Sequence, residues 1–157
     1  MVTVASFEFA MVGAEDGSVA FLHRDASEAL RYLEVTRDGA TTFDASVAFP
    51  AELESPRIND GLRIADDEIL VVGAHGTAST RPWMGIVQRS SDTLTVRALS
   101  LPPVPLAATP EENIGTLLRV GRFTDGDIFG AGTLGPTRPI DQYVAAMRIR
   151  SLDPVDA

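Results

Sequence analysis

The residue types best suited to ligand chemistry gather around two copies of a Thr-Arg-Pro tripeptide. The copies are Thr80-Arg81-Pro82 and Thr137-Arg138-Pro139. A guanidinium binds a carboxylate or a phosphate through two parallel hydrogen bonds, so both arginines are candidate anion ligands. The alternative is that each arginine pairs with one of the 22 acidic residues of the chain, while proline shapes the loop.

Residues near these tripeptides would add to such a site. Trp83 directly follows Pro82, and His75 lies shortly before the first copy. An indole and an imidazole beside a guanidinium form an amphipathic recognition patch. The alternative is that Trp83 packs in the core and that His75 is a hydrogen-bonded structural residue. The sequence assigns no catalytic residue, and it predicts a ligand-binding site at the following positions: His75, Thr80, Arg81, Trp83, Thr137, Arg138 and Asp141.

Residues 130–135 match the dinucleotide-binding pattern G-x-G-x-x-G. That pattern binds pyrophosphate only where it opens a helix, because the helix N-terminus supplies the free N–H groups. Pro136 follows at once and no helical pattern comes after it. We therefore do not expect a nucleotide site here.

Metal and nucleophilic chemistry have little support in the sequence. The chain has no cysteine, which excludes disulfides, thiolate nucleophiles and Cys-ligated zinc. No G-x-S-x-G nucleophile elbow occurs. The acidic stretches 66–68 and 125–127 lack the spaced pattern of a calcium loop and fall at expected turns. We expect no metal site and no cofactor.

The elements that would hold these residues are β-strands. Runs rich in β-branched and aromatic residues recur along the chain, for example at 19–22, 32–36 and 42–49. Asp-Gly pairs fall between such runs and tolerate the positive φ that tight hairpin turns need. These pairs are Asp16-Gly17, Asp38-Gly39 and Asp125-Gly126. The pattern predicts an all-β protein built from hairpins.

Short motifs also recur about 57 residues apart. Leu62-Arg63-Ile64 is followed by Leu118-Arg119-Val120, and Gly73-Ala74 by Gly130-Ala131. The two Thr-Arg-Pro tripeptides keep the same spacing. We interpret the chain as a single all-β domain, residues 1–157, with repeat units at approximately 12–50, 58–102 and 114–153.

The third unit lacks a fourth strand, whereas residues 41–50 and 93–102 supply one to the first two units. Residues 2–9 show the same alternation and form a spare strand. We expect this spare strand to close the last unit, because pairing the two chain ends would hide two sheet edges.

Two stretches indicate helix instead of strand. Residues 109–112, Thr-Pro-Glu-Glu, place threonine at an N-cap and proline at the first helical position. Residues 25–30 indicate a single helical turn inside the first unit.

The stretch 124–132, an Asp-Gly turn followed by a strand ending in glycine, resembles the repeats of β-propeller proteins. The resemblance covers most of the chain at blade level and implies about three four-stranded blades. The first unit departs from the pattern, with His23-Arg24-Asp25 in place of Gly-Ala and no Thr-Arg-Pro loop. Because propellers close with about four to eight blades, we expect a six-bladed homodimer, or a partner chain that completes the ring. The alternative architecture is a closed antiparallel β-barrel.

Composition narrows the partners. The formal net charge of −9 would repel nucleic acid and anionic membranes. The N-terminus has no basic segment, and apolar runs such as residues 69–72 are too short to span a bilayer. We expect a soluble, cytoplasmic protein that binds neither nucleic acid nor membrane.

Three functions are compatible with these features. In a propeller, the loops between second and third strands share one mouth of the channel, which would place Arg81 and Arg138 on one face. The first hypothesis is a binding or assembly module that dimerises and holds a small anionic ligand or an acidic peptide there. The second is an enzyme, a lyase, isomerase or hydrolase, with its site in the channel mouth. The third is a structural subunit of a larger assembly.

Overall fold

The computed structural model of the chain describes residues 8–77, 80–99, 114–135 and 143–149, and every regular element in them is a β-strand. The all-β prediction is therefore confirmed for this part of the chain. Over the same residues, the chain contains no helix with the length and apolarity needed to cross a lipid bilayer. The expected helix at 109–112 lies outside the described residues.

Sheet 1 is an antiparallel meander of four consecutive strands, each paired with the next. Its residues alternate between buried and exposed, as expected for a sheet covered on one face. In β1 the pattern is strict, with Ala10 and Val12 buried. The strands are β1 (Phe9–Gly13), β2 (Val19–Arg24), β3 (Leu30–Val35) and β4 (Thr41–Val47).

Sheets 2 and 3 have the same meander topology, with four strands and three strands respectively. None of the three sheets closes on itself within the described residues, so the β-barrel alternative is wrong for this part of the chain. Sheet 2 contains β5 (Arg57–Ala65), β6 (Glu68–His75), β7 (Arg81–Ser90) and β8 (Thr93–Leu99). Sheet 3 contains β9 (Ile114–Arg122), β10 (Ile128–Gly135) and β11 (Tyr143–Ile149).

The Asp-Gly pairs form the hairpin turns that the sequence predicts. In the turn between β3 and β4, the N–H of Thr36 donates to the carbonyl of Ala40, and Gly39 adopts a φ of 89°. The turns after β1 and β9 have the same hydrogen bonds. Residues 25–29 also form this hairpin turn, with Glu28 at a φ of 66° in the glycine position, so the expected helical turn is wrong.

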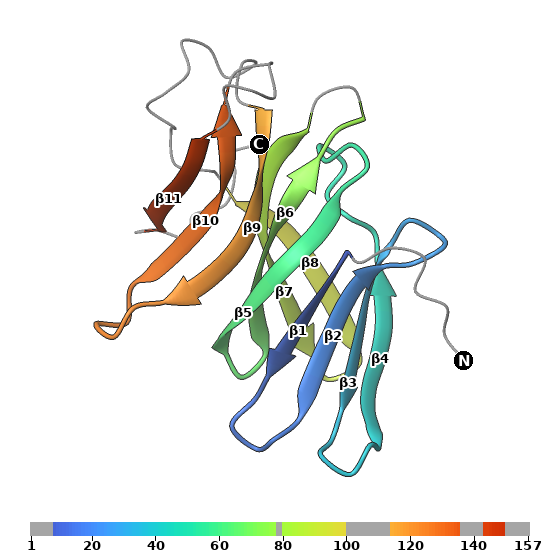
Figure 1. Ribbon diagram of the computed structural model, residues 1–157. Coiled ribbons are helices and arrows are strands. Elements are labelled where there is room, and N and C mark those ends of the chain that lie inside the picture. Colours follow the sequence, from blue (N-terminus) through green and yellow to red (C-terminus); the bar gives the residue numbers. More distant parts are fainter. Residues whose placement is uncertain (1–7, 78–79, 100–113, 136–142, 150–157) are drawn as a thin grey trace.

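The three sheets stack face to face, with sheet 2 in the middle (Figure 1). Strand β1 packs beside β5, whereas β9 packs across β5, β6 and β7 of the middle sheet. The β1–β2, β5–β6 and β9–β10 turns lie toward the bottom of Figure 1. We call this the turn end of the stack.

Sheet 2 is buried on both faces, which explains the uninterrupted apolar runs of β6 and β7. Six successive residues are buried in each of these two strands. One face carries Ile69, Val71 and Trp83 and packs on sheet 1. The opposite face carries Leu70, Val72, Met84 and Ile86 and packs on sheet 3. Burying each such aliphatic side chain contributes about 1.5–3 kcal/mol, so these two layers dominate the stability of the fold.

The motifs that recur in the sequence do not occupy equivalent positions in the sheets. Gly73 pairs with Ile58 far from the β5–β6 turn, whereas Gly130 pairs with Val120 close to the β9–β10 turn. The two turns differ in length, since only Asp66 and Asp67 separate β5 from β6. The spacing therefore identifies similar strands but not a common register.

The N-terminal boundary of the first unit also differs from the prediction. Phe9 belongs to β1 and pairs with His23, so sheet 1 begins before residue 12. Residues 1–7, most of the expected spare strand, lie outside the described residues, so its expected pairing with the last strand of sheet 3, β11, stays a prediction.

The tight packing of sheet 2 predicts that Gly73→Ala is strongly destabilising. A Cβ at position 73 would overlap the carbonyl oxygen of Arg57 and lie 2.9 Å from Nε1 of Trp83. We expect a loss of roughly 1–3 kcal/mol in the free energy of unfolding, measured by urea denaturation. Gly13→Ala is the matched control, because no atom lies within 4 Å of its added Cβ. Equal stability of the two variants would contradict this account of the packing.

Candidate functional site

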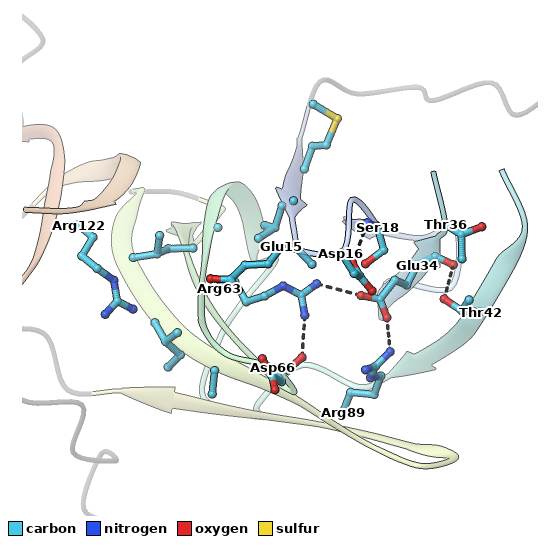
Figure 2. A pocket seen from close by; sticks show the side chains of 18 residues that line it. Glu15, Asp16, Ser18, Glu34, Thr36, Thr42, Arg63, Asp66, Arg89 and Arg122 are labelled. Carbon is cyan, nitrogen blue, oxygen red and sulfur yellow. Dashed lines mark hydrogen bonds and ion pairs between the residues drawn. The ribbon is translucent and has the colours of Figure 1, made fainter. Parts of the chain in front are cut away.

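A pocket of about 950 Å³ lies between sheets 1 and 2 at the turn end (Figure 2). The end of β1 and the turn that follows it form one wall, and β5 forms the wall opposite. Charged and hydroxyl side chains from all three sheets and from the turns between their strands line it (Figure 2). Its polar lining residues include Ser18, Glu34, Thr36, Arg63, Arg89 and Arg122.

Glu34 is the central charged residue of this pocket. Its side chain is only 5% exposed, although it comes from β3 of the outer sheet. One carboxylate oxygen accepts a hydrogen bond of 2.9 Å from Arg63 of β5. The other oxygen accepts a hydrogen bond from Arg89 of β7. The carboxylate therefore joins sheet 1 to two strands of sheet 2.

Both arginines are held by further contacts. Arg63 donates a second hydrogen bond of 2.7 Å to the carbonyl of Asp66. Its Nε is buried and has no protein partner among the described residues. The guanidinium of Arg89 lies 5.7 Å from the ring centre of Phe43, and that ring packs edge-on against buried Tyr32. Burial raises the pKa of Tyr32, and the negative charge of Glu34 adds to this effect.

The charges around the pocket are mixed. Arg122 of β9 lines it with a guanidinium that forms no ion pair within the described residues. Glu15, Asp16 and Asp66 line the same pocket, and all three are exposed. The hydroxyl of Ser18 holds the pKa of Asp16 below its usual value, so this carboxylate is ionised at neutral pH. The pocket thus has no field of a single sign that would attract a simple anion or cation.

The structure brings two of the predicted ligand-binding residues together, at the end of sheet 2 opposite to the pocket. His75 and Arg81 are cross-strand neighbours at the ends of β6 and β7. Arg81 is exposed, and its side chain forms no hydrogen bond or ion pair with another described residue. Burial lowers the pKa of His75, and the positive charge of Arg81 lowers it further. Nδ1 of His75 is buried without a partner in the described part of the chain.

Trp83 is a core residue, and the backbone of Thr80 contacts sheet 3. Trp83 is 2% exposed, donates a 2.9 Å hydrogen bond to the carbonyl of Arg57, and packs edge-on against Phe49. The carbonyl of Thr80 accepts a hydrogen bond from Gly115 at the start of β9. Arg81 and Pro82 belong to β7, so the first Thr-Arg-Pro tripeptide is mostly strand and not loop. The other predicted site residues, Thr137, Arg138 and Asp141, lie outside the described residues.

The described residues do not form a group of side chains that would support the enzyme hypothesis. Among the described residues, His75 forms no ion pair with a carboxylate, and no group of three or more His, Asp or Glu side chains could hold a metal ion.

Sequence reasoning missed Glu34, although a signal for it was present. Glu34 alternates with Leu30 and Tyr32 along β3, which places its charge on the apolar face of an amphipathic strand. An ionised group on such a face needs a partner from the sheet that covers it. Nothing in the local sequence of Arg63 or Arg89 identifies these residues as that partner.

Comparisons with known protein families, with curated proteins and with solved structures find no match to this chain. The fold and the geometry of the described residues therefore carry the functional argument alone.

The buried position of Glu34 predicts a large effect of its removal. We expect Glu34→Leu to lower the free energy of unfolding by roughly 3–5 kcal/mol, because Arg63 would remain as an uncompensated buried charge. The triple variant Glu34→Leu/Arg63→Met/Arg89→Met should recover most of this loss in urea denaturation. Asp44→Asn, which breaks the more exposed Arg31–Asp44 pair of the same sheet, is the control and should cost less than about 1 kcal/mol. A loss for Glu34→Leu as small as that of the control would contradict a buried ion cluster.

Proposed function

We propose that this chain is an assembly module: three blades of a propeller-like ring that a second chain completes. The observation that carries this proposal is the contrast between sheet 2, covered on both faces, and the two outer sheets, each covered on one. A propeller repeats four-stranded antiparallel sheets around an axis, and three meander sheets stacked face to face support this reading. Within the described residues, one face of sheet 1 and one face of sheet 3 have no neighbouring sheet.

The uncovered face of sheet 1 is suited to burial. We call it the outer face of sheet 1, and its middle row of cross-strand neighbours is Met11, Phe21, Leu33 and Asp44. The next row is Phe9, His23, Arg31 and Ser46, so β1 and β2 supply the apolar part of this face and the Arg31–Asp44 ion pair borders it. Phe9 and Met11 are exposed, and Phe21 and Leu33 beside them are half-buried. An exposed apolar patch of this kind marks an interaction surface in many soluble proteins.

The outward side of sheet 3 also presents both apolar and charged side chains. The outer face of sheet 3 carries Phe129 and Arg148 in register, with Phe123 in the adjoining turn. Arg148 forms ion pairs with Asp125 and Asp127. Apolar rings bordered by satisfied charges are typical of the core and rim of a protein interface.

The proposal predicts that the purified chain forms a dimer of two 16.7 kDa subunits in light scattering. Met11→Asp should raise the dimer dissociation constant by roughly 10- to 100-fold, since it would bury an unpaired carboxylate in the contact. Thr95→Asp, at an exposed position of β8, is the control and should leave the dimer intact. A stable monomer at all accessible concentrations would refute self-association and favour a structural subunit of a mixed assembly.

The exposed guanidinium of Arg81 supports a second function at the opposite end of sheet 2. This side chain has no carboxylate partner among the described residues and lies beside His75. An unpaired guanidinium next to an imidazole is suited to a small anionic ligand, such as a carboxylate or a phosphate ester.

A thermal-shift screen with small anionic metabolites tests this second function. A ligand at about 100 times its dissociation constant should raise the melting temperature by roughly 5–10 °C. Combining Arg81→Ala with Arg138→Ala should abolish the shift, whereas Arg122→Ala, at the turn end, should preserve it. A shift that survives the double variant would remove this face from consideration.

A further inference from the structure

The pocket at the turn end reaches both sides of β5, so its two halves differ in chemistry. Successive residues of a strand point to opposite faces of the sheet. Arg63 points toward sheet 1, where it pairs with Glu34. Leu62 and Ile64 line the pocket too, but they pack against the apolar cluster between sheets 2 and 3. Arg122 of β9 lines the pocket from sheet 3. A ligand at the mouth of the pocket would therefore contact a charged half and an apolar half.

Some charges of this pocket have no partner in the described protein. Glu34 and its two arginines are paired with one another. Within the part of the chain that the structure describes, the side chains of Arg122, Glu15 and Asp66 form no hydrogen bond and no ion pair. All three are exposed, and Arg122 lies apart from Glu34 and its arginines in Figure 2. One guanidinium and two carboxylates thus remain available to a ligand.

The presence of both signs disfavours the simplest ligands. Over the described residues, no group of three or more His, Asp or Glu side chains could hold a metal ion. A small anion would pair with Arg122 but would be repelled by Glu15 and Asp66, and the net charge of −9 adds to this repulsion. A molecule with one positive end and one negative end carries no net charge and can pair with both signs.

We propose that the mouth of this pocket binds short apolar peptides with free termini. Arg122 binds the C-terminal carboxylate, and Glu15 and Asp66 bind the N-terminal ammonium. The apolar side chains of the peptide lie on Leu62 and Ile64. The pocket volume of about 950 Å³ suits a di- or tripeptide, since pockets for small organic ligands measure about 300–1,000 Å³. This site is independent of the assembly function and of the anion site at the opposite end of sheet 2.

Isothermal titration calorimetry of the full chain with leucyl-leucine tests the ligand class. Two temperatures are used, because burial of apolar surface changes the heat capacity and reveals binding whose enthalpy is near zero at one of them. Three matched ligands each lack one feature: N-acetyl-leucyl-leucine lacks the ammonium, leucyl-leucinamide lacks the carboxylate, and glycyl-glycine lacks the apolar side chains. We expect each to bind at least about ten-fold more weakly than leucyl-leucine.

Two substitutions test the residues assigned to each end of the peptide. Arg122→Ala should weaken leucyl-leucine at least about ten-fold but should not weaken leucyl-leucinamide, which has no carboxylate to lose. Asp66→Asn should weaken leucyl-leucine but not N-acetyl-leucyl-leucine. Asp67→Asn is the matched control for the carboxylate, because Asp67 is exposed beside Asp66 and does not line the pocket. Arg81→Ala, at the opposite end of sheet 2, is the control for the guanidinium. Both controls should bind leucyl-leucine as the parent chain does.

All four substitutions change exposed side chains, so the midpoint of urea denaturation should stay that of the parent chain. Lack of leucyl-leucine binding up to about 10 mM would overturn the site, since a weaker affinity is below that of a specific contact. Equal binding of the acetylated or the amidated peptide would overturn recognition of both termini. Leucyl-leucine binding that survives both Arg122→Ala and Asp66→Asn would overturn the assignment to this pocket.

Discussion

Burial of sheet 2 on both faces is the constraint from which the rest of the structure follows. A sheet covered on both faces needs apolar side chains at successive positions, and β6 and β7 supply them without interruption. The outer sheets need apolar residues on one face only, which accounts for the alternation in β1 and β3. The hydrophobic pattern of a strand thus indicates where its sheet lies: a continuous apolar run belongs to the middle sheet, and alternation belongs to an outer sheet.

Electrostatics adds specificity to this hydrophobic arrangement. Removing a carboxylate and two guanidiniums from water costs several kcal/mol for each ion, and their attraction offsets this cost only when the geometry is good. Glu34 meets Arg63 and Arg89 only when β3 lies over β5 and β7 in the observed register. A sliding of sheet 1 across sheet 2 would leave these charges buried and unpaired, although apolar contacts alone would tolerate it. The ion cluster therefore selects one arrangement of the two sheets.

The sequence predicted the strands and turns well because their determinants are local. Asp-Gly pairs and β-branched runs act over a few residues, and the hairpins at Asp16-Gly17 and Asp38-Gly39 formed as expected. The pairing register within each hairpin could not be predicted from the sequence. Gly73 and Gly130 occur in the same Gly-Ala motif, but Gly73 pairs far from its hairpin turn and Gly130 pairs close to its own.

The candidate site was harder to predict for a related reason. His75 and Arg81 are close because β6 and β7 are consecutive, and such neighbours can be inferred from the sequence. Trp83 stands two residues from Arg81, yet its side chain points into the core. The ion cluster in the pocket, Glu34 with Arg63 and Arg89, joins three strands whose spacing follows no short motif, so only the packed sheets reveal it.

The consecutive order of the strands has a consequence for folding kinetics. Every strand pairing in the described residues joins elements adjacent in the chain, so each sheet grows by closing short loops, which costs little entropy. The contacts that fix one sheet on another span much longer loops: Glu34 reaches Arg63 and Arg89, and the carboxylate of Asp60 accepts a hydrogen bond from the N–H of Val120. We expect the three meanders to form early and the docking of preformed sheets to limit the rate. Substitutions within a hairpin would then alter mainly early steps, whereas loss of the Glu34 cluster would slow the final docking step.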